Sequence, residues 1–279
     1  MRSTTRLGRW STGGAALLLA VSLAACGSDD DSGSDTEATE TSAAETTEAE
    51  GGDADAFCAA AVEAETTIGQ GPPVDFEAAT PEEIEAALAE FSQDLEPTLE
   101  ELESVAPEEI SSDVESLSGQ VRQALETGDD SVFESEEFVS ADAAIDEYML
   151  DNCGFEQIEA TGVDYEYEGI PDTVPAGTVA VTFDNQGEEV HEIGIVRIND
   201  DVTASVEELL AMPEDQVMSM ITFTGVAFAN PGESDTTFLR LEPGRYAAAC
   251  FVPEGTTHDT EGGGPPHFTL GMFAEFTAE

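Results

Sequence analysis

Thiols and imidazoles are the side chains of this sequence that could do chemistry, and they are few. The 279 residues include four cysteines and three histidines. No His-Glu-x-x-His motif and no Ser/His/Asp order of a catalytic triad is present, so we do not expect an enzyme. Thiolates and imidazoles are also the usual protein ligands of transition metals. These residues are Cys26, Cys58, Cys153, Cys250, His191, His258 and His267.

The first 25 residues predict an export signal. Met1–Arg9 carries three arginines and is followed by the apolar run Ala15–Ala25. This run is shorter than the about 20 residues of a permanent membrane span. Residues 23–26 read Leu-Ala-Ala-Cys, which resembles the lipobox of bacterial lipoproteins. That resemblance implies cleavage before Cys26, a lipid on its thiol, and a place on the extracytoplasmic face of the cell membrane.

An acidic segment of low complexity follows the lipobox. After Cys26, residues up to 55 are Ser, Thr, Gly, Ala, Asp and Glu without a large apolar side chain, so residues 26–55 predict a disordered tether. The whole chain has seven arginines and no lysine against 62 acidic residues, a formal charge of −55. Binding of nucleic acid needs clustered cations and is excluded. The acidity favours a solvated surface, and a protein partner would be basic.

Three cysteines remain for the exported part of the chain, where disulfides persist. An odd number leaves at least one thiol without an intramolecular partner. Cys58 and Cys153 bracket one helical region, whereas Cys250 lies far away in a β-rich region. The economical prediction is a Cys58–Cys153 disulfide and a lone Cys250 that is either buried and inert or a metal ligand.

Residues 56–158 predict a helical domain. Thr80 is followed by Pro-Glu-Glu, which is a capping box with proline at the first helical position. Apolar residues then recur at spacings of 4, 3 and 4, and Pro97 is expected to bend or interrupt the helix. The stripe consists of Ile84, Leu88, Phe91 and Leu95. Further helices are expected over residues 56–68, 106–128 and 140–152.

Residues 159–279 predict a β-sandwich. Here the helical period gives way to short apolar stretches separated by turn-rich connections. About seven short strands in this length are typical of an antiparallel sandwich. The expected strands are 163–168, 177–183, 190–198, 221–228, 236–241, 245–252 and 267–277. The predicted fold class is therefore α+β multidomain, with an N-terminal helical bundle followed by a C-terminal β-sandwich.

Two motifs in the β-rich region are informative. In the first, Asn185-x-Gly187 is followed by His191. In the second, Pro243-Gly244-x-Tyr246 leads to Cys250 and then to Pro266-His267-x4-Met272. Together they resemble the cupredoxin family, the plastocyanin and azurin type of blue-copper domain. The resemblance covers residues 162–279, about two-fifths of the chain, and leaves the helical domain uncovered.

The resemblance implies one type 1 copper site with His191, Cys250, His267 and Met272 as ligands. Such a site combines two imidazoles, a thiolate and a long axial thioether. One geometry then serves both Cu(I) and Cu(II), which implies one-electron transfer. It also implies that His267 lies near the surface as the edge through which electrons leave, and that the partner is a redox or copper-exchange protein.

One interval departs from the family pattern. Residues 251–266, 16 in number, separate Cys250 from His267, where the family has only a few. We expect the strand to finish by residue 253 and residues 254–265 to form an excursion before His267. His258 lies inside this excursion and is the substitute candidate for the second imidazole.

Two other functions remain open at this stage. A metal-free module with a cupredoxin-like fold would use the sandwich and the helices as interaction surfaces. A copper-delivery protein would use the same four ligands as an electron carrier. An enzyme is not expected, because a copper ion with four protein ligands has no open position for a substrate.

Overall fold

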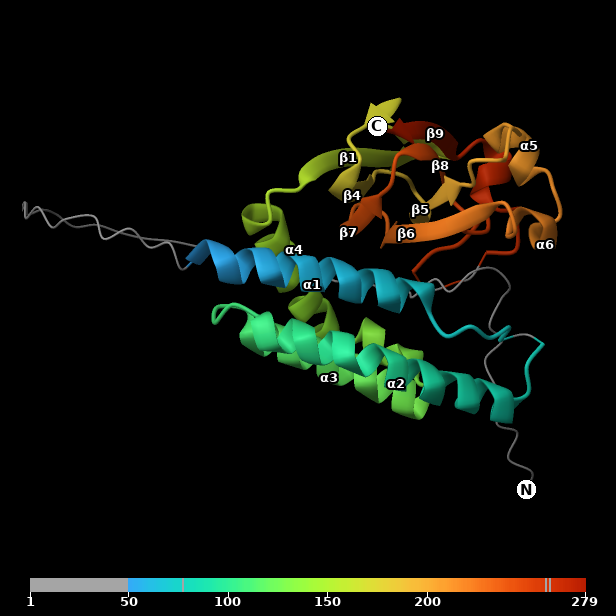
Figure 1. The fold of residues 1–279 in the computed structure, drawn as a ribbon. Helices are drawn as coiled ribbons and strands as arrows, with labels where there is room; N and C mark the ends of the chain where they lie inside the picture. The colour runs from blue at the N-terminus through green and yellow to red at the C-terminus, as the bar shows by residue number, and fades with distance from the viewer. Residues whose placement is uncertain (1–49, 77, 259, 261) are drawn as a thin grey trace, which may run out of the picture.

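The chain folds into a helical region and a two-sheet β-sandwich (Figure 1). The computed structural model describes residues 50–279 except residues 77, 259 and 261. The predicted fold class is confirmed. The predicted signal, the lipidation site Cys26 and the tether as far as residue 49 lie outside the described residues. No helix within the described ranges has the length and apolar character that crossing a membrane requires.

Four α-helices and one 3-10 helix form the helical region. The capping box at Thr80 is present, since its hydroxyl accepts the Glu83 N–H and the Glu83 carboxylate accepts the Thr80 N–H at 2.8 Å. The predicted disulfide joins Cys58 in the first helix to Cys153 directly after the last. The helices are α1 (Glu50–Gln70), α2 (Pro81–Val105), α3 (Ser111–Thr127), η1 (Asp130–Glu134) and α4 (Glu136–Asn152).

The helix boundaries differ from the predicted ones. α1 begins at Glu50, so residues 50–55 are helical where a disordered tether is predicted. Pro97 lies inside α2 without ending it. The flanking Leu95 and Leu99 are buried, and this packing offsets the lost backbone hydrogen bond.

The sandwich consists of two mixed sheets. One sheet has the order β2-β1-β4-β7 and the other β3-β9-β8-β5-β6. The bounds are β1 (Glu156–Val163), β2 (Glu166–Glu168), β3 (Thr173–Val174), β4 (Gly177–Asn185), β5 (His191–Ile198), β6 (Ile221–Ala229), β7 (Ser234–Leu241), β8 (Gly244–Ala249) and β9 (Phe273–Ala278). Three short helices lie in the connections, namely α5 (Val206–Leu210), α6 (Glu214–Val217) and η2 (His267–Leu270).

The sequence predicts a purely antiparallel sandwich. This prediction is wrong for two pairs of neighbouring strands, β1–β4 and β3–β9, which are parallel. Between β1 and β4 the chain leaves the first sheet after β2, adds β3 to the second sheet and returns to the first sheet as β4. This crossing lets β4 re-enter the first sheet beside β1 in the same direction. The strand predicted over 163–168 is instead the end of β1, a turn and β2, and the turn residues Asp164 and Tyr165 have positive φ angles of 36° and 70°.

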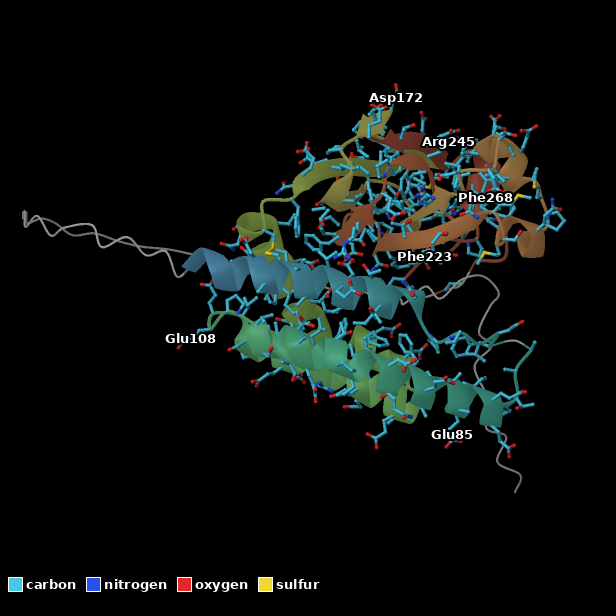
Figure 2. The ribbon with its side chains drawn as sticks, in the orientation of Figure 1. Glu85, Glu108, Asp172, Phe223, Arg245 and Phe268 are labelled. Carbon is cyan, nitrogen blue, oxygen red and sulfur yellow. A yellow bond between two sulfur atoms is a disulfide. The ribbon has the colours of Figure 1, made fainter. Side chains whose placement is uncertain are left out.

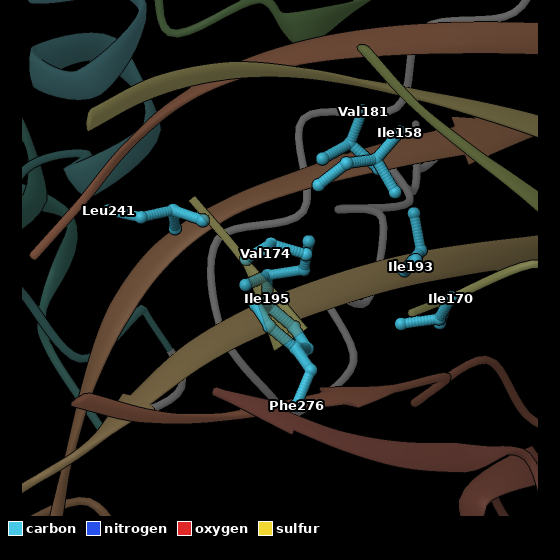
Figure 3. Close-up of a pocket in the computed structure, with 8 residues that line it drawn as sticks. All are labelled: Ile158, Ile170, Val174, Val181, Ile193, Ile195, Leu241 and Phe276. Carbon is cyan, nitrogen blue, oxygen red and sulfur yellow. The ribbon is translucent and has the colours of Figure 1, made fainter. Parts of the chain in front are cut away.

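Apolar side chains from both sheets fill the space between them. The cavity in this core has a volume of about 10 Å³, far below the about 300–1,000 Å³ of a small-molecule site (Figure 3). Its walls are Ile158, Ile170, Val174, Val181, Ile193, Ile195, Leu241 and Phe276. This interior is a packed core rather than a ligand pocket.

The helical region packs on the outer face of the sheet that contains β4 and β7. α1 lies between the other helices and the sandwich (Figure 1). Phe238 of β7 belongs to the same apolar cluster as the helices, and its ring lies 5.9 Å from that of Phe155. Figure 2 shows Phe223 on the side of the sandwich that faces the helices, whereas Glu85 and Asp172 point outwards into solvent.

Acidic side chains gather at this interface. The Glu65 carboxylate of α1 accepts the Thr237 hydroxyl at 2.6 Å and the Phe238 N–H at 3.0 Å, which covers the free edge of β7. Beside it, carboxylate oxygens of Asp142, Asp146 and Asp235 lie within 4.8 Å of one another. Burial raises the pKa of Glu65 to about 8 and that of Asp142 to about 7, with mutual repulsion adding to the effect.

This cluster predicts that the free energy of unfolding falls as the pH rises from about 4.5 to about 8. In this window the folded state binds more protons than the unfolded state, because the pKa of Glu65 rises from 4.5 to about 8 on folding. The stabilisation is complete below the unfolded pKa and is lost as the pH passes the folded one. Each pKa unit of difference corresponds to about 1.4 kcal/mol.

Urea unfolding at pH 5 and pH 8 checks this expectation. Glu65→Gln should reduce the pH dependence, because the amide cannot lose a proton. Glu90→Gln removes the same charge from an exposed position on α2 and should keep the dependence of the unmodified protein. Equal pH dependence in the two variants would show that Glu65 is not the group responsible.

Candidate metal centre

Three ligand-type atoms converge at one end of the sandwich. The two Nδ1 atoms of His191 and His267 lie 3.0 Å apart, and the Cys250 Sγ lies 3.4 Å from the Nδ1 of His267. All three side chains have no exposed surface. His191 begins β5, Cys250 directly follows β8, and His267 begins η2. Residues that are far apart in sequence are therefore held together by two adjacent strands and one helical turn.

Backbone hydrogen bonds fix the strand ends that carry the ligands. The Cys250 N–H donates to the Met272 carbonyl at 3.1 Å, and the Met272 N–H donates to the His267 carbonyl at 3.1 Å. The side chain of Met272 is also fully buried. A Cβ atom at Gly162 would lie 3.1 Å from its terminal methyl group, so the thioether is confined by β1. Met272 therefore shares the site with the three other predicted ligands.

The long interval between Cys250 and His267 closes on itself. Pro253 and Pro266 form an antiparallel bridge at its base. The Glu254 N–H donates to the Pro265 carbonyl at 2.9 Å, and the His267 N–H donates to the Val252 carbonyl at 3.0 Å. Residues 254–265 thus form the excursion predicted from the sequence. Because its two ends meet, the 16 intervening residues do not separate the ligands.

Two expectations about the histidines are corrected. His267 does not lie on a strand near the surface, since it is in η2 and fully buried under neighbouring side chains. His258, the substitute candidate, is exposed on the excursion and outside the converging group. The bridge at the base of the excursion places His267, rather than His258, next to Cys250.

The loop between β4 and β5 holds His191 in place. The loop is anchored by Asn185, the fully buried last residue of β4, whose Nδ2 donates to the carbonyl groups of Glu189 and Ala229 at 2.8 Å each. The Oδ1 of Asn185 accepts the Gly187 N–H at 2.9 Å. A Cβ atom at Gly187 would lie 2.6 Å from the Nε2 of His191. The motif Asn185-x-Gly187 therefore folds the loop tightly against this imidazole.

Glu189 contacts the other imidazole. Its Oε2 lies 3.1 Å from the Nε2 of His267 and accepts the Gly255 N–H at 2.6 Å, while its Oε1 accepts the Tyr165 hydroxyl at 3.1 Å. The Tyr165 ring also lies 4.7 Å from the His267 ring. The left-handed turn after β1 thus serves the site, because it brings this tyrosine over the imidazole.

Burial sets the protonation of the three ligands. It raises the pKa of the Cys250 thiol to about 12, and the nearby Glu192 carboxyl adds to this. It lowers the pKa of His191 to about 4, assisted by the neighbouring His267, whose own pKa burial also lowers. Both imidazoles are therefore neutral at pH 7 and have lone pairs available for a cation. The thiol would lose its proton when a cation binds.

The donor set fits one soft or borderline transition-metal ion. Nitrogen and sulfur atoms that bind one such ion at about 2.0–2.3 Å lie no more than about 4.5 Å apart. The measured separations of 3.0 and 3.4 Å satisfy this limit. Two imidazoles, one thiolate and one thioether are the ligands of a type 1 copper site. By contrast, all-oxygen ligands would be needed for Mg²⁺ or Ca²⁺.

Replacing Gly187 by alanine tests how tightly the loop positions His191. The new methyl group would lie 2.6 Å from the Nε2 of His191 and 3.2 Å from the Asn185 Oδ1, so the imidazole must move. We expect copper affinity to fall by about 10–100-fold, as when a supporting contact of a ligand is lost. Competition with a chelator measures it. Gly263→Ala, where no heavy atom lies within 4 Å, is the control, and an equal affinity in both variants would refute the effect.

Sequence reasoning missed Glu189 and Tyr165. Glu189 stands beside Glu188 in a chain with 62 acidic residues, so no local pattern distinguishes the half-buried carboxylate at the site from the exposed one. Tyr165 was expected inside a strand. Tyr165 instead lies in a turn with a positive φ angle, and this turn brings its side chain to the site.

Comparisons with known proteins give matches among solved structures alone. No family model matches the chain, and no curated protein is significantly similar. A reduced auracyanin from Roseiflexus castenholzii is 27% identical over 44% of this chain and 96% of its own, with a TM-score of 0.31. Auracyanin A from Chloroflexus aurantiacus, a blue copper protein, is 21% identical over 45% of this chain and 100% of its own, with a TM-score of 0.31.

A rusticyanin from Thiobacillus ferrooxidans is 14% identical over 44% of this chain and 78% of its own, with a TM-score of 0.28. The ligands lie at the start of β5, directly after β8, in η2 and directly before β9, in the order His, Cys, His and Met. The C-terminal part of the chain is a two-sheet β-sandwich in which His191, Cys250, His267 and Met272 fit a single type 1 copper site.

Proposed function

We propose that this protein binds one copper ion and carries single electrons outside the cytoplasm. The observation that supports the proposal is the convergence of two imidazole nitrogens and a thiol sulfur, 3.0–3.4 Å apart, in a site without exposed surface. When bound, copper would supply the one-electron Cu(II)/Cu(I) couple. The ligands would be His191, Cys250, His267 and Met272.

The residues around the site favour electron transfer over catalysis. The four side chains are buried, so water and substrates are kept away from the ion. Backbone hydrogen bonds link Cys250, Met272 and His267 in series, and the buried Asn185 fixes the loop before His191. A rigid donor set changes little when an electron arrives or leaves. Four protein ligands also leave no open position for a substrate, so we propose a carrier rather than an enzyme.

The proposed location follows from the N-terminal sequence. A lipid on Cys26 and the acidic segment up to residue 49 would tether the folded part to the outer face of the cell membrane. The charge of −55 would steer a basic redox partner towards the protein, and that encounter would weaken as salt is added.

The buried position of His267 requires another surface for contact with the partner. Phe251, which directly follows Cys250, is 45% exposed, and Leu270, two residues before Met272, is 41% exposed. The Phe251 ring lies 5.2 Å from that of Phe268, next to His267 in sequence. We therefore propose this apolar surface, rather than an imidazole edge, as the place where electrons leave.

A copper titration of the purified protein, followed by visible absorption, tests the proposal. An electron carrier should show an intense thiolate-to-Cu(II) band that saturates at one copper per chain and bleaches reversibly on reduction. Electron exchange with a basic redox protein should slow as ionic strength rises. A colourless protein that retains no copper would instead favour the metal-free module. If the protein gives up its copper ion to an acceptor and the bound ion does not cycle between Cu(II) and Cu(I), a copper-delivery protein would be favoured.

A further inference from the structure

We propose that Glu189 is the positioning residue that closes the copper site and fixes His267 as a ligand, an inference that rests on the proposed copper site. The carboxylate of Glu189 joins three separate parts of the chain. These are the turn after β1 through Tyr165, the excursion through Gly255, and the ligand helix through His267.

Glu189 determines which nitrogen of the His267 ring carries the proton. The Nε2 of this ring lies 3.1 Å from the Glu189 Oε2, whereas its Nδ1 faces Cys250 and His191. A carboxylate accepts hydrogen bonds but donates none, so the proton of the neutral imidazole is held on Nε2. The Nδ1 lone pair is then directed at the metal position. A carboxylate bound to the outer nitrogen of a ligand histidine also increases the basicity of the inner one.

The two histidines are held in place in different ways. The Nε2 of His191 is buried and has no hydrogen-bond partner among the described residues, and packing against Gly187 holds this ring. His267 lies on a short 3-10 turn that follows the excursion, so its position depends on how the excursion is anchored. A hydrogen bond to a fixed carboxylate provides the anchor that packing provides for His191.

Glu189 also anchors the excursion, residues 254–265. Glu189 is itself held rigidly, because its carbonyl accepts the Nδ2 of the buried Asn185 at 2.8 Å. Its carboxylate accepts the Gly255 N–H, and the next residue, Val190, donates its N–H to the Thr256 carbonyl at 3.0 Å. Residues 254–265 are thus attached to the same loop that carries His191. Loss of the Glu189 carboxylate would therefore loosen both residues 254–265 and the ligand His267.

Three hydrogen-bond donors surround the Glu189 carboxylate. They are the Gly255 N–H at 2.6 Å, the Tyr165 hydroxyl at 3.1 Å and the His267 Nε2 at 3.1 Å. These contacts come from three parts of the chain and together fix the position of the carboxylate. Its neighbour Glu188 is exposed and makes no such set of contacts.

The test compares Glu189→Gln with Glu188→Gln in the full chain. The two substitutions remove the same charge from adjacent positions, but only the first removes an acceptor from the site. We expect a chelator to extract copper about 10–100-fold faster from Glu189→Gln than from the unmodified protein. We also expect faster amide hydrogen exchange at Gly255 in the metal-free protein. Glu188→Gln should match the unmodified protein in both measurements.

Two further variants separate position from charge and allow for misfolding. Glu189→Asp keeps the charge but is one methylene shorter, so it should still release copper quickly. If it behaves like the unmodified protein, charge rather than position is responsible and the proposal is overturned. Tyr165→Phe removes a single donor to Glu189 and keeps the ring, so it should show a smaller increase in both rates even if Glu189→Gln does not fold. Unchanged rates in Tyr165→Phe would count against the proposal.

The failure of the proposed function can be distinguished from the failure of this inference. If the unmodified protein binds no copper, the electron-carrier proposal is wrong. Nitrogen chemical shifts of His267 in the metal-free chain still report which ring nitrogen carries the proton. A proton on Nε2 that becomes shared between both nitrogens in Glu189→Gln supports the positioning role. The same tautomer in both proteins overturns it.

Discussion

Replacing Cys250 by serine is expected to abolish the intense visible band of the copper-loaded protein. The band requires electron donation from a thiolate to Cu(II), and a serine hydroxyl stays protonated at neutral pH. The sulfur also supplies the soft ligand that stabilises Cu(I). Among the described residues Cys250 is the one free cysteine, so no other thiolate within the described part of the chain can replace it.

Visible absorption during copper titration measures this effect. The release of one proton per copper in the unmodified protein is a second signature, because burial raises the Cys250 pKa to about 12 and the thiol is protonated before the ion binds. The variant should release fewer protons. Circular dichroism controls for folding, since a buried hydroxyl without a partner costs about 1–3 kcal/mol. An intact band in Cys250→Ser would exclude the thiolate as a ligand.

Removing the disulfide is expected to cause the largest loss of stability. The bond between Cys58 and Cys153 links residues 95 positions apart and closes nearly the whole helical region into one loop. Constraining such a loop in the unfolded state is worth about 2–5 kcal/mol. The double variant Cys58→Ala/Cys153→Ala should therefore unfold at a clearly lower urea concentration.

The copper site is expected to survive this change. Its ligands belong to the sandwich, and the helices pack on the outer face of the other sheet through Phe238 and Phe155. The double variant should thus keep its copper band at low urea while its unfolding midpoint shifts. Treatment of the unmodified protein with a reductant should reproduce the shift. If neither the double variant nor reduction moves the midpoint, the disulfide does not stabilise the fold.

The covering of the second histidine changes how the copper site would work. A buried imidazole held by Glu189 cannot form a direct contact with a partner, so electrons would leave near Phe251 instead. The cover over His267 includes Glu189 and Tyr165, which lie outside the 16 residues between Cys250 and His267.

The local sequence determined the elements and the ligand types. The capping box at Thr80 and the stripe after it predicted α2, because a helix repeats its buried face at intervals that a short window reveals. Cysteine counting, in a chain whose N-terminal sequence predicts export, predicted the pairing of Cys58 with Cys153. The resemblance of the two motifs to the cupredoxin family implied a copper-type donor set of His191, Cys250, His267 and Met272, since ligand chemistry depends on residue type.

The tertiary structure alone decided how these parts meet. The parallel pair β1–β4, the bridge between Pro253 and Pro266, and the contact between Glu189 and His267 all join residues that are distant in sequence or indistinguishable from their neighbours. Their pairing depends on which surfaces remain available after the rest of the chain has packed. A periodic pattern reports the face that a residue occupies within its own element, but it carries no information on the partner across the fold.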